Sequence, residues 1–143
     1  VLLIAADGAQ VIGEESVEGQ KATRVDAIIG EDVIAGTLIY TGVFVAAGMN
    51  TLTEEYLVGA KAMPISFWFD GEGRVVQIKF DAGSAYQTIS DNLFESVKDL
   101  EGYEDAQKLV INSYSLEYRM EDINSASEVE FPDEVLNATV LTE

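Results

Sequence analysis

The chain has 143 residues, with 26 acidic and 8 basic side chains and a formal net charge of −18. Its hydrophobic share of 48% is too high for a disordered chain, and its length suits one domain with a core. The negative field repels phosphate backbones and anionic headgroups, so we expect no nucleic-acid partner, and membrane attachment only through an anchor outside this chain.

The sequence contains neither cysteine nor histidine. It therefore lacks thiol nucleophiles, disulfides, the usual general base and the commonest ligands of transition metals. We expect no cofactor, no metal site and no enzymatic activity. Because the first residue is Val1 and no signal-peptide pattern follows it, we also expect a processed or trimmed part of a longer product.

The first predicted elements are two strands, over residues 11–17 and 21–29, joined by a tight turn at Glu18 and Gly19. In the second strand Val25, Ala27 and Ile29 share one face, a period of two that is typical of a half-buried strand.

An uncharged run, residues 33–49, follows the first hairpin. It is shorter than the roughly 20 apolar residues of a membrane-spanning helix, so we expect it to be buried in protein or to face an enclosed apolar ligand. Glu31 and Asp32 suit a helix N-terminus and predict a helix over residues 32–40. Residues 43–45 fit either strand or helix, and the capping-box spacing of residues 51–54 predicts a second helix over 52–62.

Residues 64–81 form the clearest pattern, an antiparallel hairpin with a turn at residues 70–73. Alternation places Ile65, Phe67 and Phe69 on a buried face and Trp68 on the opposite face.

A helical stripe of Ile89, Leu93, Val97 and Leu100 comes next, with Gly102 as the expected helix end. Strands are then predicted over residues 109–120 and 128–131. Antiparallel strands that carry helical insertions indicate an α+β fold in one domain.

Acidic clusters offer two other sites. Four acids around Gly102 could bind calcium through oxygen atoms, but the EF-hand spacing is absent and we favour a solvated loop. The adjacent acids at 14–15 and 121–122 point to opposite faces of a strand, which does not suit glycoside hydrolysis. The four acids around Gly102 are Asp99, Glu101, Glu104 and Asp105.

Three short motifs, taken in order, resemble LppX/LprG-type lipoproteins of the LolA-like superfamily. They are a Glu-x-(Val/Ile)-x-Gly hairpin, a Pro-x-x-x-Trp-x-Asp strand and a closing Asp-x-Asn segment that ends at proline. The matching residues are Glu15, Val17 and Gly19, then Pro64, Trp68 and Asp70, then Asp122, Asn124, Val129 and Pro132.

The resemblance implies a strongly curved antiparallel β-sheet, a half-barrel, with helices packed on its concave face. Residues 1–143 would be a single domain of this type that lacks the family's N-terminal strands. It implies an exported envelope lipoprotein domain, anchored or secreted, that binds or carries a lipid in a cavity under the sheet. The cavity residues expected are Ile34, Leu38, Ile39, Phe44, Met49, Phe67, Phe69 and Ile78.

Two alternatives stay open from the residues. The uncharged run can be ordinary core without any cavity. The chain can also be a non-catalytic structural or interaction module that assembles through exposed sheet edges and its apolar segment, because open edges recruit partners.

Overall fold

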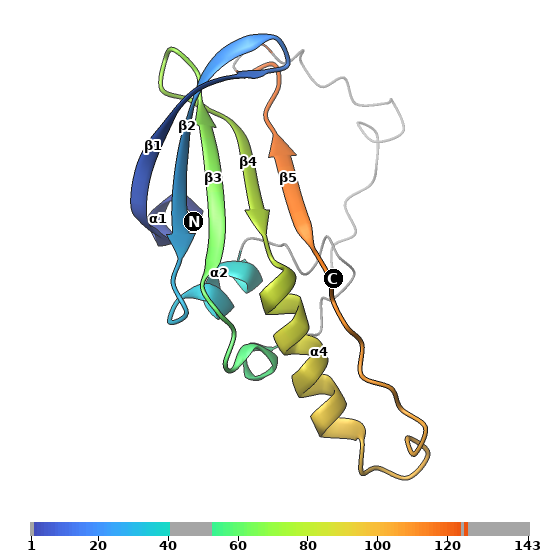
Figure 1. Ribbon diagram of the computed structural model, residues 1–143. Helices are drawn as coiled ribbons and strands as arrows, with labels where there is room; N and C mark the ends of the chain where they lie inside the picture. The colour runs from blue at the N-terminus through green and yellow to red at the C-terminus, as the bar shows by residue number, and fades with distance from the viewer. Residues whose placement is uncertain (1, 41–52, 124, 126–143) are drawn as a thin grey trace, which may run out of the picture.

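A computed structural model describes residues 2–40, 53–123 and 125 (Figure 1). Its centre is a five-stranded antiparallel sheet in the order β1-β2-β3-β4-β5, so each strand lies beside its neighbours in sequence and the sheet stays open. This confirms the α+β class. The strands are β1 (Ala6–Val17), β2 (Gln20–Ile29), β3 (Met63–Phe69), β4 (Val75–Asp81) and β5 (Ser115–Arg119). The helical elements are α1 (Leu2–Ala5), α2 (Ile34–Tyr40), the 3-10 helix η1 (Glu54–Leu57) and α4 (Gly83–Val97).

Both predicted hairpins are present. Glu18 and Gly19 have φ values of 50° and 80°, which fits the type I′ turn that matches the twist of a two-residue hairpin. At the β3–β4 turn, the Asp70 carboxylate accepts hydrogen bonds from the backbone N–H groups of Glu72 and Arg74, each at 2.9 Å. Backbone conformation at the first turn and the Asp70 carboxylate at the second therefore fix the register of the strands that each turn joins.

One face of the sheet, which we call the core face, packs against the helical elements. The fully buried residues on it include Ile29, Met63, Ile65, Phe67 and Phe80. α2, η1 and α4 lie at one end of the sheet and cover this face there (Figure 1). The helical residues buried against it include Ile34, Leu38, Leu57, Ala85 and Ile89. The predicted helix over residues 32–40 is confirmed, with its first turn beginning at Ile34.

The predicted helix over residues 52–62 is wrong. Only η1 forms there, and the Thr53 side chain caps no backbone N–H group; its hydroxyl donates to the Glu55 carboxylate at 3.0 Å. Gly59 has a φ of 84°, a conformation that ends helical structure. Burial of Leu57 and Ala60, rather than helix propensity, fixes this segment.

α4 differs from its prediction in where it starts and in what it buries. It begins at Gly83 and buries Ala85, Tyr86 and Ile89, but not the rest of the predicted stripe. The helix ends at Val97 with Lys98 as its C-cap, so Gly102 does not end it. Figure 1 shows the reason, since α4 leaves the end of β4 and projects beyond the sheet.

The strand predicted over residues 109–120 is shorter than expected. Only Ser115–Arg119 pairs with β4, while residues 109–111 bind α4 through the side chain of Gln87. The backbone N–H of Ile111 donates to Gln87 Oε1 at 2.7 Å, and Gln87 Nε2 donates to the Leu109 carbonyl at 3.1 Å. The Gln87 side-chain amide thus binds the backbone groups that a neighbouring strand would bind if residues 109–111 were part of the sheet. The segments predicted at residues 43–45 and 128–131 lie outside the described residues.

Candidate functional site

The residues expected to line a ligand cavity fall into two groups. Ile34, Leu38 and Phe67 are buried in the core cluster, whereas Phe69 and Ile78 are partly buried and pack against it. Ile39 lies in α2, and two more of the expected residues, Phe44 and Met49, lie outside the described residues. None of the five side chains in these two groups lines the groove beside Trp68 or the pocket at the hairpin turns. The cavity itself stays a prediction.

The core face becomes more exposed away from the helices. Ile29 and Met63, which pair with each other beside α2 and η1, are both fully buried. Four residues further along the strands, Phe67 in the central strand is still buried, whereas Tyr118 and Val11 in the two edge strands are 36% and 72% exposed. We call this surface the open part of the core face. Its residues are Val11, Val25, Phe69, Val75, Ile78 and Tyr118.

The opposite, outer face carries a polar cluster around a buried tryptophan. Trp68 is only 5% exposed, its indole N–H donates to the Glu15 carboxylate at 2.8 Å, and the Arg24 guanidinium lies 5.3 Å from its ring centre. Arg24 also binds both carboxylate oxygens of Asp26, at 2.7 and 3.0 Å, and Ser66 donates to the same carboxylate at 2.7 Å. The prediction that Trp68 faces away from Phe67 is confirmed. A groove of about 580 Å³ opens beside this cluster.

Electrostatics of this cluster follow from the Arg24–Asp26 pair. Hydrogen bonds from Arg24 lower the pKa of Asp26 below its ordinary value of 3.8, and the same contact raises the pKa of Arg24. A carboxylate whose pKa is lower in the folded state than in the unfolded state stabilises the fold at any pH above its unfolded-state pKa. This stabilisation is lost as the pH falls through the folded-state pKa.

We therefore predict a pH-dependent stability difference between the natural chain and Asp26→Asn. The natural chain is the more stable at pH 7, and the gap closes as the pH falls below 3.8. Urea unfolding of both chains from pH 7 to pH 3 measures their free energies of unfolding. Subtracting one free energy from the other at each pH removes the effect of protonating the other acids, which the two chains share. A gap that grows on acidification contradicts the assignment.

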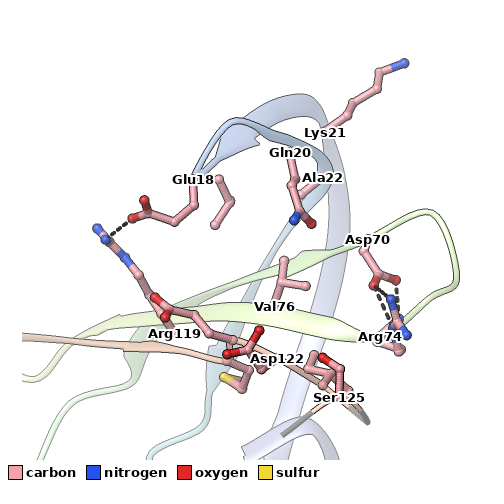
Figure 2. A pocket seen from close by; sticks show the side chains of 14 residues that line it. Glu18, Gln20, Lys21, Ala22, Asp70, Arg74, Val76, Arg119, Asp122 and Ser125 are labelled. Carbon is pink, nitrogen blue, oxygen red and sulfur yellow. Dashed lines mark hydrogen bonds and ion pairs between the residues drawn. The ribbon is translucent and has the colours of Figure 1, made fainter.

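A second pocket, of about 370 Å³, lies where the two hairpin turns meet the end of β5 (Figure 2). Its charged rim is formed by Glu18, Lys21, Asp70, Arg74, Arg119, Glu121 and Asp122. Apolar lining comes from Val17, Ala22, Val76, Met120 and Ile123.

Both guanidinium groups at this pocket already have carboxylate partners. Arg74 contacts Asp70 at 2.7 Å and Glu72 at 2.9 Å. Arg119 pairs with Glu117 at 2.6 Å and also with Glu18, which ties the β1–β2 turn to the far edge strand (Figure 2). Hydrogen bonds from the Arg74 backbone and side chain lower the pKa of Asp70. Lys21, the third cation on the rim, pairs with Glu14 at 2.5 Å, so each cation that lines this pocket among the described residues has a carboxylate partner.

The acidic clusters considered from the sequence are separated or exposed. Glu15 binds Trp68 on the outer face, whereas Glu14 pairs with Lys21, so the two adjacent acids do not share one site. The four acids around Gly102 are all exposed. Across residues 2–40, 53–123 and 125, no three acidic side chains are arranged to hold a metal ion.

Strand alternation alone does not identify the outer-face cluster. It placed Trp68 on that face, but the partners Glu15 and Arg24 come from two other strands. Their convergence depends on the pairing of β1, β2 and β3. A local signal did exist, because Arg24 and Asp26 are two residues apart on one strand and therefore share a face.

No family model, curated protein or solved structure matched this chain. Within the described residues, none of the helices has the length and apolar character needed to cross a membrane.

Proposed function

We propose that this chain is an extracytoplasmic LolA-like domain that binds a lipid or another hydrophobic ligand against the core face of its sheet. In this proposal the sheet curves as a half-barrel around the ligand, and any membrane anchor lies outside the chain. Support comes from the exposure of the core face, since apolar side chains continue past the part that α2, η1 and α4 cover.

The energetics suit an acyl chain. Each buried methylene contributes about 0.8 kcal/mol, so ten methylenes give roughly 8 kcal/mol, which corresponds to micromolar binding. The open part of the core face supplies apolar contacts from β1 to β5, including the rings of Phe69 and Tyr118.

A direct test begins with protein recovered from its host, with mass spectrometry of the extracted ligand. The purified chain is then titrated with a fluorescent fatty-acid analogue, for which we expect saturable binding. Tyr118→Asp introduces a charge on the open part of the core face and should weaken binding at least about tenfold.

Ile28→Asp is the matched control, because Ile28 is a half-exposed apolar residue on the outer face of the same sheet. It should leave the affinity unchanged. The proposal fails if no lipid co-purifies and no titration saturates, or if the two variants weaken binding equally.

A structural or interaction module is the second candidate, and β1 favours it. In the described part of the chain β1 pairs only with β2, and its residues Val11 and Ile12 are 72% and 53% exposed. Two register shifts in the β1–β2 pairing limit the length of this edge that is regular enough to pair with another chain. Light scattering distinguishes the candidates, since defined oligomers or fibres favour assembly and a monomer at all concentrations disfavours it.

A further inference from the structure

The last turns of α4 carry an apolar stripe that the core does not use. Leu93 is 37% exposed, Leu100, just past the helix end, is 53% exposed, and Val97 between them is partly exposed. These are the residues that sequence periodicity placed on a buried helix face. They remain outside the core because α4 projects beyond the sheet (Figure 1).

Segments on both sides of the stripe are held in place by α4 itself. On one side, Asn92 Nδ2 donates to the carbonyl oxygens of Tyr56 and Val58, at 2.9 and 3.1 Å. On the other side, the Ser90 hydroxyl donates to the Leu109 carbonyl at 3.1 Å. At 100° per residue, positions 90 and 92 lie on opposite sides of the stripe.

These flanking segments add further apolar surface. The side chains of Val58 and Leu109 are 71% and 67% exposed, although their backbones are anchored to the helix. Hydrogen bonds to α4 hold both segments beside the stripe, and exposed apolar side chains that gather in one place within a polar rim are typical of a surface that contacts a partner.

The charge around the stripe is strongly negative. The two local cations are neutralised, because Lys98 pairs with Glu95 at 2.5 Å and Lys108 pairs with Asp91 at 3.1 Å. Four exposed acids follow the helix, and within the part of the chain that the structure describes none of them forms an ion pair. They are Asp99, Glu101, Glu104 and Asp105.

The exposed apolar stripe and the negative charge around it together indicate which kind of partner can bind here. A second copy of the chain and an anionic membrane both carry the same sign of charge and are repelled. A positively charged helix with its own apolar stripe satisfies both features, because apolar anchors at i, i+4 and i+7 are the spacing by which helices dock. We propose that the projecting end of α4 is a docking surface for a basic amphipathic helix of a partner protein.

The probe for this proposal is a synthetic, fluorescently labelled helical peptide of leucine and lysine, with the leucines on one face. Anisotropy titration against the purified full chain should show saturable one-to-one binding. The double variant Leu93→Ser/Leu100→Ser should weaken it at least about tenfold. Both side chains are partly exposed, and circular dichroism checks that the variant still folds.

Two controls separate docking from simple charge attraction. A peptide of the same composition in scrambled order keeps the charge but loses the apolar face, and it should bind at least about tenfold more weakly. Ile12→Ser removes an exposed apolar side chain from β1 and should leave the affinity unchanged. Asp99→Asn/Glu101→Gln should weaken binding and reduce its salt dependence.

Several results would overturn the proposal. Equal binding of the two peptides means that only charge is recognised, and unchanged binding by the double variant means that the stripe is not used. Self-association of the chain, or sedimentation with neutral phosphatidylcholine vesicles, that is lost in the double variant assigns the stripe to a second copy or to a membrane.

Discussion

Replacing Phe67 with alanine should lower the free energy of unfolding by about 3–5 kcal/mol. Phe67 is 2% exposed at the centre of the core face, between Val25 of β2 and Ile78 of β4. Its removal loses the transfer free energy of a ring and leaves a cavity among strands whose register prevents collapse. Since domains are stable by only about 5–15 kcal/mol, this is a large part of the total.

Urea unfolding monitored by circular dichroism measures this loss. The control is Phe69→Ala, in the same strand and on the same face, where the side chain is partly exposed and its ring centre lies 6.3 Å from that of Phe67. It should cost distinctly less, because burial and not ring chemistry sets the size of the effect. Equal losses would show that the core does not thin out between these two residues.

The second large effect is expected at Trp68, on the other side of the sheet. Trp68→Ala should cost about 3 kcal/mol, because an almost fully buried ring is lost together with its contact to Arg24. Trp68→Phe keeps most of the ring but leaves the Glu15 carboxylate without its indole donor, and it should cost about 1–2 kcal/mol.

Unfolding must again be monitored by circular dichroism, since the chain contains one tryptophan and both variants remove it. Glu15→Gln is the control that keeps an oxygen acceptor for the indole while it removes a charge from Arg24. If Trp68→Ala costs no more than Trp68→Phe, the ring does not contribute through packing. In that case the outer-face cluster is a polar surface and not a second, smaller core.

The two faces of the sheet suggest a division of roles. On the outer face, Glu15, Arg24 and Trp68 form hydrogen bonds and a cation–π contact with one another. The core face is complete only where helices cover it, and the proposed ligand site is on the remainder. The proposed docking surface on α4 lies outside both faces, so a partner and a ligand do not compete for the same residues.

The amino-acid sequence by itself determined the local features. Period-two alternation placed Phe67 and Trp68 on opposite faces, and Glu18 and Gly19 specified a tight turn. Each of these depends on residues that are close in sequence, whose backbone geometry is restricted by a short list of allowed conformations.

Only the tertiary structure decided which apolar residues are buried and which distant segments contact one another. Periodicity predicted that Ile89 and Leu100 are both buried, yet only Ile89 is, because α4 projects beyond the sheet and Leu100 lies past the end of this helix. Gln87 replaces a strand neighbour for residues 109–111, and Arg24 finds Glu15 and Trp68 on adjacent strands. Burial and long-range pairing depend on where separate segments meet, which a local pattern of apolar residues does not encode.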